Sequence, residues 1–269
     1  MSNNIFEQSK EVFLDVVDAK EYIQLDRVSI IYNALKDAIK KPLKMILLYG
    51  RPGTGKSMML NKLYRDLFEH QKVILYQTPI IDENEFFRSL ARDVYDHHTD
   101  NEINFTRFNE LSATYDFDVV PLVLLDEAQL YAPSLMEKIR LISDSRKIKF
   151  VFTLHKTERE DLIAKEHFKT RIWESQELYN ATPAELKLYI QKKLMRANGF
   201  DVANMFNEKN VKLIHTLTAG NYRETNKLLF TLFGIYEWYD DNQPTKINYT
   251  NISHKTIEMA AIRTGLIHA

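Results

Sequence analysis

The stretch Gly50–Ser57, with the sequence GRPGTGKS, fits the phosphate-binding pattern G-x-x-x-x-G-K-[ST]. It lies between an apolar run at 45–49 and a segment with helical spacing that follows from Met58. The pattern requires this context, because such a loop joins a strand to the N-terminus of a helix. The chain has only 7 glycines and three of them fall in this stretch, so a chance match is a poor explanation.

The residue types of this stretch suit a bound triphosphate. Glycines let the backbone curl with its N–H groups pointing inward, and the positive end of the following helix adds to the attraction for an anion. Lys56 is expected to reach the β- and γ-phosphates of ATP, and the Ser57 hydroxyl to ligate Mg²⁺. The residues expected to contact ATP here are Gly50, Arg51, Pro52, Gly53, Thr54, Gly55, Lys56, Ser57 and Met58.

Five short apolar runs, each bounded by turn or cap residues, are predicted to be buried strands. They are Met45–Tyr49, Val73–Gln77, Val119–Leu125, Ile148–Leu154 and Gln176–Tyr179. The segments between them have helical spacing, as at 58–68 and 135–142. Strands that alternate with helices predict an α/β fold, a P-loop parallel sheet flanked by helices, with ligands at the carboxyl ends of the strands.

The pattern changes after Asn180. Thr182, Pro183 and Glu185 supply an N-cap, a first-turn proline and a capping-box acid, and the helix that they begin ends near Gly199. Three more helical segments are expected at 211–217, 223–239 and 251–262, with a loop at 240–244. We therefore predict two domains: a nucleotide-binding α/β core over residues 1–180 and a small all-helical lid over residues 181–269.

The third apolar run ends in Asp126 and Glu127, which is typical of a Walker B strand. Asp126 is expected to hold Mg²⁺ through its water shell, and Glu127 to orient and deprotonate the attacking water. The alternative is that Asp126 only caps the next helix, a common arrangement where strands end in acids. The upstream phosphate loop favours the catalytic interpretation.

The fourth run ends in polar residues that are candidates for sensing the nucleotide. Thr153 or His155 is expected to hydrogen-bond the attacking water or the γ-phosphate. The alternatives are that threonine is present as a good strand former and that the histidine is structural or exposed.

Two arginines are candidates for coupling hydrolysis to movement. Arg171, in the segment 167–171 just before the last strand, is expected to act in trans on a neighbouring subunit's nucleotide, as an arginine finger. Arg223 opens a lid helix and is expected to reach the γ-phosphate. The alternatives are a solvated surface arginine for Arg171 and a plain helix-start residue for Arg223.

Composition narrows the class of protein. The 36 basic and 37 acidic side chains give a net charge of −1, which offers no global attraction to nucleic acid or anionic lipid. There are no cysteines, and the eight histidines show no metal-binding spacing. The start of the chain is no secretory signal, and the most apolar late stretch, Leu228–Tyr239, is too short to span a bilayer. We expect a cytoplasmic protein without a membrane span.

Taken together, these motifs resemble those of the AAA+ ATPases over nearly the whole chain. The lead-in from Phe13 to Tyr49, the string Leu124–Gln129, the segment Thr182–Gly199 and the following Gly220–Arg223 look like the ATPase domain of the ExeA/GspA/MshM group. That group energises type II secretion or type IV pilus machines. The core also resembles the TniB and TnsC transposition ATPases and, more distantly, origin-recognition initiators. The resemblance implies ATP-dependent self-assembly into a homo-oligomer.

Three functions follow from these observations. The first is an ATPase that drives assembly or remodelling of an envelope machine, with a protein partner. The second is an ATP-dependent, DNA-binding regulator of transposition or replication. Its best basic cluster, equally explained as solvated surface, is Arg140, Arg146, Lys147 and Lys149. The third, an ATP-sensing switch with negligible turnover, is disfavoured by the intact Glu127.

Overall fold

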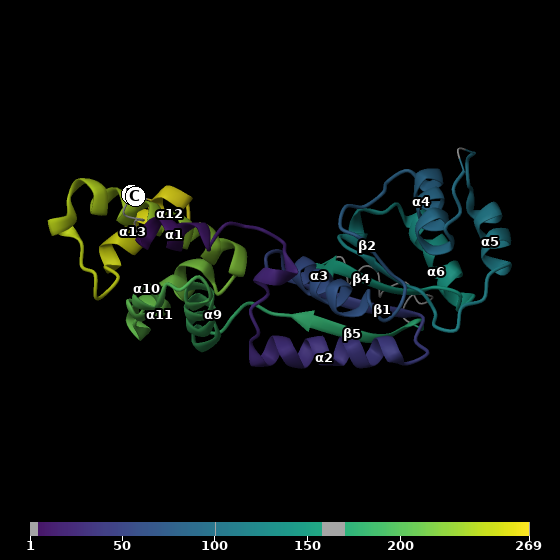
Figure 1. Cartoon of the computed structure of the whole chain (residues 1–269), viewed down its shortest axis with the longest axis horizontal. Coiled ribbons are helices and arrows are strands. Elements are labelled where there is room, and N and C mark those ends of the chain that lie inside the picture. Colours follow the sequence, from purple (N-terminus) through teal and green to yellow (C-terminus); the bar gives the residue numbers. More distant parts are fainter. Residues whose placement is uncertain (1–4, 100, 158–169, 269) are drawn as a thin grey trace. The chain divides into compact units, whose positions relative to one another are not determined.

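The computed structural model describes residues 5–99, 101–157 and 170–268 (Figure 1). Residue contacts divide the chain into two compact units. The core unit is Arg27–Leu178, and the helical unit combines Tyr179 onward with the residues up to Asp26. The N-terminal segment, which we grouped with the α/β core from the sequence, therefore packs with the helical unit. Phe6 and Phe13 anchor it there, since both are buried in that unit's hydrophobic cluster.

The core unit holds a five-stranded parallel sheet in the order β2-β3-β4-β1-β5. Its strands are β1 Met45–Gly50, β2 Val73–Tyr76, β3 Leu122–Leu125, β4 Lys149–His155 and β5 Ile172–Leu178. The predicted fold class, a parallel sheet flanked by helices with a helical region after it, is confirmed. Because the strands are parallel, their carboxyl ends meet at one edge of the sheet.

Two strands differ from the prediction by more than one residue at an end, and the other three differ by a single residue at one or both ends. β3 begins at Leu122 instead of Val119, because Pro121 lacks a backbone N–H for the sheet and Val119 is 55% exposed. β5 begins at Ile172, four residues earlier than expected. Its polar residues concealed it in the sequence, because an edge strand is only partly buried and lacks a continuous apolar run.

Helices cover both faces of the sheet (Figure 1). They are α2 Asp26–Lys40, α3 Lys56–Leu67, α4 Glu83–Tyr95, α5 Phe105–Ala113, the 3-10 turn η2 Ala128–Leu130 and α6 Pro133–Asp144. Alternate strand residues point to opposite faces. Ile46 and Leu48 of β1 therefore pack with α2 and α3, whereas Met45 and Leu47 pack with α4 and α6.

The helical unit contains the helices that the sequence predicted after Asn180. Its elements are α1 Ile5–Glu11, η1 Ala19–Glu21, α9 Pro183–Arg196, α10 Phe200–Asn204, α11 Glu208–Thr218, α12 Tyr222–Asn242, η3 Pro244–Lys246 and α13 His254–Thr264. The predicted capping box between Thr182 and Glu185 begins α9. The loop expected at 240–244 is shorter, because α12 continues to Asn242. Within the described residues, no helix has the length and apolarity to cross a membrane.

Candidate functional site

The loop between β1 and α3 has a backbone that glycine makes possible. Gly53 and Gly55 adopt left-handed φ values of 76° and 94°. A Cβ at Gly50 would lie 2.4 Å from the carbonyl oxygen of Leu178, so β5 packs directly against the start of the loop. A Cβ at Gly55 would meet no atom within 4 Å. The space beside this glycine is therefore open, as a loop that wraps phosphate requires.

Lys56 begins α3 and is 5% exposed. Its ammonium donates to the carbonyl oxygens of Gly50 and Arg51, each at 3.1 Å. The Thr54 hydroxyl also donates to Arg51, at 2.8 Å, which tightens the turn. The predicted cation is thus held inside the loop that it is expected to serve, and Ser57 follows it in the first turn of the helix.

Asp126 stands at the carboxyl end of β3 and is 4% exposed. Its Oδ1 accepts a 2.5 Å hydrogen bond from the Thr153 hydroxyl and a 3.0 Å bond from the backbone N–H of Glu127. The helix α6 instead has Ala132 at its N-cap. Asp126 therefore does not cap α6, which removes the alternative given for it. Two fixed donors hold one carboxylate oxygen, leaving the other to act on a ligand.

Thr153 is fully buried on β4, and its hydroxyl contacts the two acidic residues instead of facing solvent. Besides donating to Asp126, it accepts a 3.0 Å bond from the Glu127 N–H. The sensor role predicted for Thr153 stays a prediction. The geometry shows that Thr153 contacts the carboxylate that is predicted to hold Mg²⁺.

The Glu127 backbone is in the left-handed region, with φ of 51°, and its side chain is 35% exposed. Its Oε2 accepts a hydrogen bond from Gln129 and lies 3.4 Å from Nε2 of His155. Gln129 was not predicted as a site residue. The turn at 128–130 that folds it back toward the carboxylate depends on the backbone of Glu127, which no sequence pattern reveals.

The ends of β1 and β4 lie side by side, because Gly50 is the register partner of His155. Leu125 of β3 is paired with Phe152 of β4, which places Asp126 at the same edge. The phosphate loop, the acidic pair and His155 are thus brought together at the carboxyl edge, as the sequence predicted for a P-loop fold.

The residues present fit a Mg²⁺ ion bound together with a nucleotide. Among the described residues, no group of three His, Cys, Asp or Glu side chains could hold a metal. Ser57 and Asp126 offer one hydroxyl and one carboxylate, a set that Mg²⁺ completes with phosphate oxygens and water. Together with the open space beside Gly55, this donor set fits Mg-ATP.

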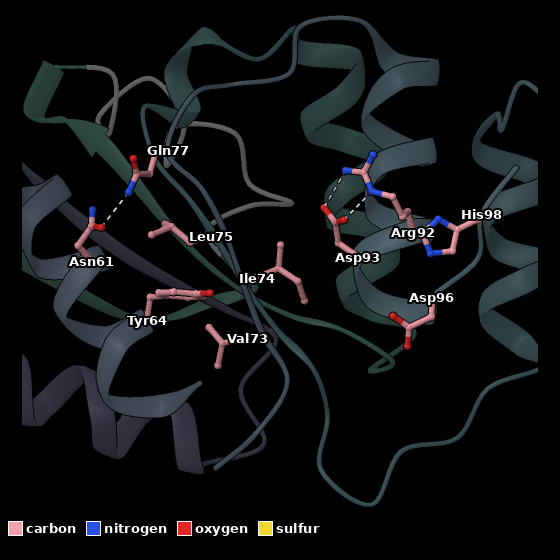
Figure 2. A pocket seen from close by; sticks show the side chains of 10 residues that line it. All are labelled: Asn61, Tyr64, Val73, Ile74, Leu75, Gln77, Arg92, Asp93, Asp96 and His98. Atoms are coloured by element: carbon pink, nitrogen blue, oxygen red, sulfur yellow. Dashed lines mark hydrogen bonds and ion pairs between the residues drawn. The ribbon is translucent and has the colours of Figure 1, made fainter. Parts of the chain in front are cut away.

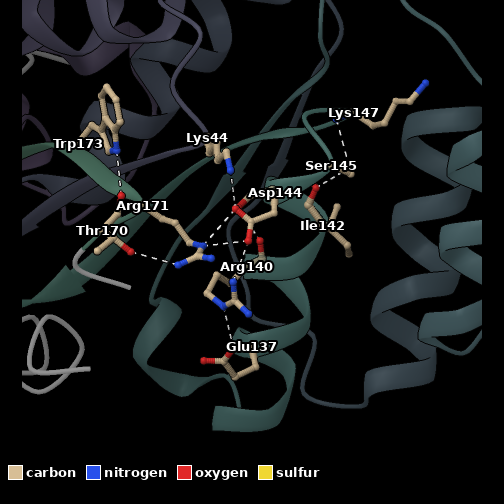
Figure 3. A network of polar contacts seen from close by, with 11 residues as sticks. Lys44, Glu137, Arg140, Ile142, Asp144, Ser145, Lys147, Thr170, Arg171 and Trp173 are labelled. Carbon is tan, nitrogen blue, oxygen red and sulfur yellow. Dashed lines mark hydrogen bonds and ion pairs between the residues drawn. The ribbon is translucent and has the colours of Figure 1, made fainter. Parts of the chain in front are cut away.

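Arg171 lies at the amino ends of the strands, opposite the carboxyl ends that carry the phosphate loop. It precedes β5, whose first residue, Ile172, pairs with Met45 at the start of β1. Its Nε lies 2.9 and 3.1 Å from the two carboxylate oxygens of Asp144, which Lys44 also binds at 2.6 Å (Figure 3). Burial alone would raise the pKa of Asp144, but the hydrogen bonds from Lys44 and Arg171 outweigh it and hold that pKa below its usual value.

The position of Arg171 is opposite the phosphate loop of its own core unit, so any action on a nucleotide would be in trans. That role stays a prediction. Residues 167–169 of the segment in which Arg171 was predicted lie outside the described residues. Arg223, the second residue of α12, belongs to the helical unit and pairs there with Asp15 at 3.2 Å, with both side chains more than half exposed. Its predicted contact with the γ-phosphate also stays a prediction.

Most residues of the basic cluster predicted from the sequence have hydrogen-bond or ion-pair partners within the chain. Arg140 pairs with two carboxylates of α6 at 2.8 Å, and Lys147 pairs with Asp116 at 2.5 Å. Lys149 donates to backbone carbonyls, and burial lowers its pKa. Only Arg146 of the four has an exposed side chain without a partner among the described residues. Three of the four residues are therefore already paired within the chain, and a role of the cluster toward DNA stays a prediction.

A cavity of about 620 Å³ lies beside the edge strand β2, between α3 and α4 (Figure 2). At one end Gln77 donates to Asn61 at 2.8 Å, and Asn61 donates to the carbonyl oxygen of Ser57 at 3.0 Å. The cavity is therefore linked to the phosphate loop through one side chain. No sequence motif indicates this cavity.

Comparisons with known proteins agree with this geometry. Residues 40–163 match the family described as AAA domain. A search of curated proteins found no match. The solved structure of Cdc6p from Pyrobaculum aerophilum is similar, with a TM-score of 0.69 and 15% identity, over 95% of this chain and 71% of that one.

Two further structures have the same fold. The ORC1 protein of Aeropyrum pernix, solved in complex with DNA, has a TM-score of 0.61 and 16% identity, over 94% of this chain and 69% of that one. The RuvB Holliday junction branch migration motor of Thermotoga maritima has a TM-score of 0.58 and 16% identity, over 92% and 72%. At these identities the likeness shows the fold, which is that of the AAA+ ATPases.

Proposed function

We propose that this chain uses its AAA+ fold to bind Mg-ATP at Gly50–Ser57 and to hydrolyse it. The observation that carries the proposal is the fixed arrangement of Asp126, Glu127 and His155 at the sheet edge that holds the phosphate loop. A phosphate loop alone binds nucleotide, whereas a positioned carboxylate beside it supplies the group that activates water.

Each residue has a distinct part in the proposed reaction. Lys56 turns from the carbonyls of Gly50 and Arg51 toward the β- and γ-phosphates. Asp126 and Ser57 hold Mg²⁺, which supplies charge neutralisation when bound. Glu127 orients the attacking water and accepts its proton.

The environment of Glu127 suggests how turnover is controlled. Its Oε2 is engaged by Gln129 and lies 3.4 Å from His155, so part of its capacity to accept hydrogen bonds is already used. We infer that these contacts at Oε2 orient the carboxylate and leave Oε1 to accept the proton of water, so that losing them would slow turnover. His155 therefore acts through Glu127 in this proposal, instead of contacting the phosphate alone.

We further propose that hydrolysis serves an action on DNA, the second of the three functions drawn from the sequence. Support comes from the similar structures, since a DNA complex of ORC1 and a branch migration motor are among them. A protein-remodelling role remains the second candidate, because the Hsp104:casein complex of S. cerevisiae is also similar, with a TM-score of 0.57. Assembly of a secretion or pilus machine would be a special case of that role.

Steady-state ATP hydrolysis separates these functions. It is measured over a range of protein concentrations, with and without DNA at low salt, using Lys56→Ala as the binding-deficient control. We expect DNA to raise the rate and added salt to remove the effect, because phosphate contacts weaken as counterions compete. A rate that depends on protein concentration but ignores DNA would favour the protein-remodelling role. No hydrolysis under any condition would contradict the ATPase proposal itself.

A further inference from the structure

Trp173 is displayed on the surface by an irregularity of the sheet. Met45 pairs with Ile172 and the next residue of β1 pairs with Glu174, so Trp173 is the extra residue of a β-bulge. Its side chain is 76% exposed, and its indole N–H donates to the carbonyl oxygen of Thr170 at 2.9 Å (Figure 3). The ring is thus held at one edge while it faces solvent. An indole exposed to this degree leaves a large apolar area in contact with water unless a ligand covers it.

The ring borders a pocket of about 330 Å³ at the amino edge of the sheet. The volume lies within the range of small-ligand sites, about 300–1,000 Å³. The cationic side chains that line the pocket are Lys44, Arg146 and Arg171. Among the described residues, Asp144 forms ion pairs with Lys44 and Arg171, and Arg146 is the third cation of the lining.

Arg146 is the cation most available to a ligand. Lys44 and Arg171 are engaged with Asp144, whereas the exposed Arg146 side chain has no partner in the described part of the chain. Its backbone has φ of 61°, the left-handed region where glycine or asparagine is favoured. A long cationic side chain is therefore present at a position whose backbone prefers a smaller residue, next to an exposed aromatic ring.

We propose that this pocket binds an unpaired nucleotide of single-stranded nucleic acid. The base stacks on the face of Trp173, and its phosphate is bound by Arg146, with Lys44 contributing charge. An aromatic platform beside cations is the combination that single-strand binding uses, because every base has a π-face and every linkage a negative charge. The inference rests on the proposed action on DNA, and it names the strand form and the residues.

Trp173 itself reports on binding. The chain has 2 tryptophans, so Trp238→Phe leaves Trp173 as the single emitting indole. That variant of the full chain is titrated at low salt with an oligothymidylate of about 15 nucleotides, a length within the usual site sizes. Stacking predicts saturable quenching of the emission, with a blunt-ended duplex of the same length giving markedly less.

Tryptophan variants then show which of the two rings contributes to the affinity. We expect Trp173→Ala to weaken the affinity for a labelled oligothymidylate at least about fivefold, whereas Trp173→Phe stays close to wild type because it keeps a π-face. Trp238→Ala, at a 52% exposed tryptophan of the helical unit, is the matched control and should leave the affinity unchanged. Hydrolysis without DNA should not change in any of the three.

Arg146→Gly supplies an independent test. Glycine suits the left-handed backbone, so the melting temperature should be unchanged or higher. Loss of one phosphate contact should reduce the slope of log affinity against log salt by about 0.7. If the variant is at least as stable as wild type but its affinity depends less on salt, the change in binding is due to the lost charge and not to folding.

Three results would overturn the pocket, and they differ in what they leave of the proposed function. The first is binding of single strand or duplex seen by anisotropy without quenching of Trp173, which contradicts the pocket alone. The second is quenching that needs ATP and rises with protein concentration in the absence of DNA, which would show that the second copy contacted by Arg171 also covers Trp173 and excludes the strand. The third is ATP hydrolysis without binding of any nucleic acid, which contradicts the action on DNA together with the pocket.

Discussion

The Thr153 hydroxyl donates a 2.5 Å hydrogen bond to Oδ1 of Asp126, and the two side chains are 0% and 4% exposed. A buried carboxylate is costly unless donors surround it. Thr153 provides one donor from a neighbouring strand, and the N–H of Glu127 provides another. The pair therefore fixes the position of the carboxylate that is proposed to hold Mg²⁺.

Thr153→Val should weaken both the proposed ATP hydrolysis and the folded state. Valine has nearly the same shape but no hydroxyl, so Asp126 loses a donor while remaining buried. We expect a loss of about 1–3 kcal/mol in the free energy of unfolding, measured with denaturant, and a higher Mg²⁺ requirement for ATP hydrolysis. Thr153→Ser, which keeps the hydroxyl, is the control and should retain most of the Mg²⁺ affinity. An unchanged Mg²⁺ requirement in the valine variant would contradict the positioning role.

Lys56→Ala and Glu127→Gln should fail at different steps. Removal of the Lys56 ammonium takes a cation from the phosphate loop, so we expect weaker ATP binding in a fluorescent-nucleotide titration. Glu127→Gln keeps the size of the side chain but cannot accept a proton, so binding should persist while turnover falls at least about 100-fold. If both variants lost binding equally, Glu127 would be acting on the fold or on the metal instead of on water.

Arg171 should act only across an interface, because it lies at the sheet edge opposite the phosphate loop of its own core unit. Arg171→Ala is expected to hydrolyse ATP at least about 100-fold more slowly, as fingers contribute strongly to the rate. Mixing it with Glu127→Gln should restore activity, because the first variant supplies an intact site and the second supplies the arginine. Failure of the mixture to recover, with both variants folded and able to associate, would contradict the role of Arg171 in trans.

The phosphate loop and the strands around it were predictable because their signals are local. Gly50–Ser57 carries the turn chemistry, the cation and the helix start within eight residues, and β1 is an uninterrupted apolar run. The capping box of α9 is similarly local, since Thr182 and Glu185 bond each other's backbone groups. The sequence predicts such features because each residue type is needed at a fixed spacing.

Features that depend on contacts distant in the chain were not predictable in this way. Phe6 and Phe13 read as ordinary apolar residues, and their place in the helical unit is set by packing against residues more than 200 positions away, such as Phe233. The bulge that displays Trp173 depends on how two strands pair. The contact of His155 with Glu127 arises only when β3 and β4 lie side by side.

A buried lysine in the helical unit gives the last prediction. Lys193 on α9 is 6% exposed, and its ammonium lies 5.4 Å from the ring centre of Phe13 and 5.6 Å from that of Tyr189. Burial lowers its pKa, despite the opposing charges of Glu21 and Asp15. The attraction to the rings therefore does not compensate fully for lost hydration of the charge.

The sign of the pH effect follows from that lowered pKa. Between the folded pKa and the unfolded value near about 10.4, the unfolded chain binds more protons, so stability rises with pH in that window. Below the folded pKa of Lys193, the free-energy cost of burying its charged side chain does not change with pH.

Lys193→Met should therefore raise the free energy of unfolding at neutral pH by about 0.5–2 kcal/mol and remove the rise of stability in alkali. Lys192→Met, at the neighbouring exposed lysine, is the control and should change stability by no more than about 0.5 kcal/mol. Denaturant unfolding from neutral pH to about pH 10 measures both effects. A loss of stability in Lys193→Met at neutral pH would contradict the prediction, because it would show that the two aromatic contacts outweigh the cost of burying the charge.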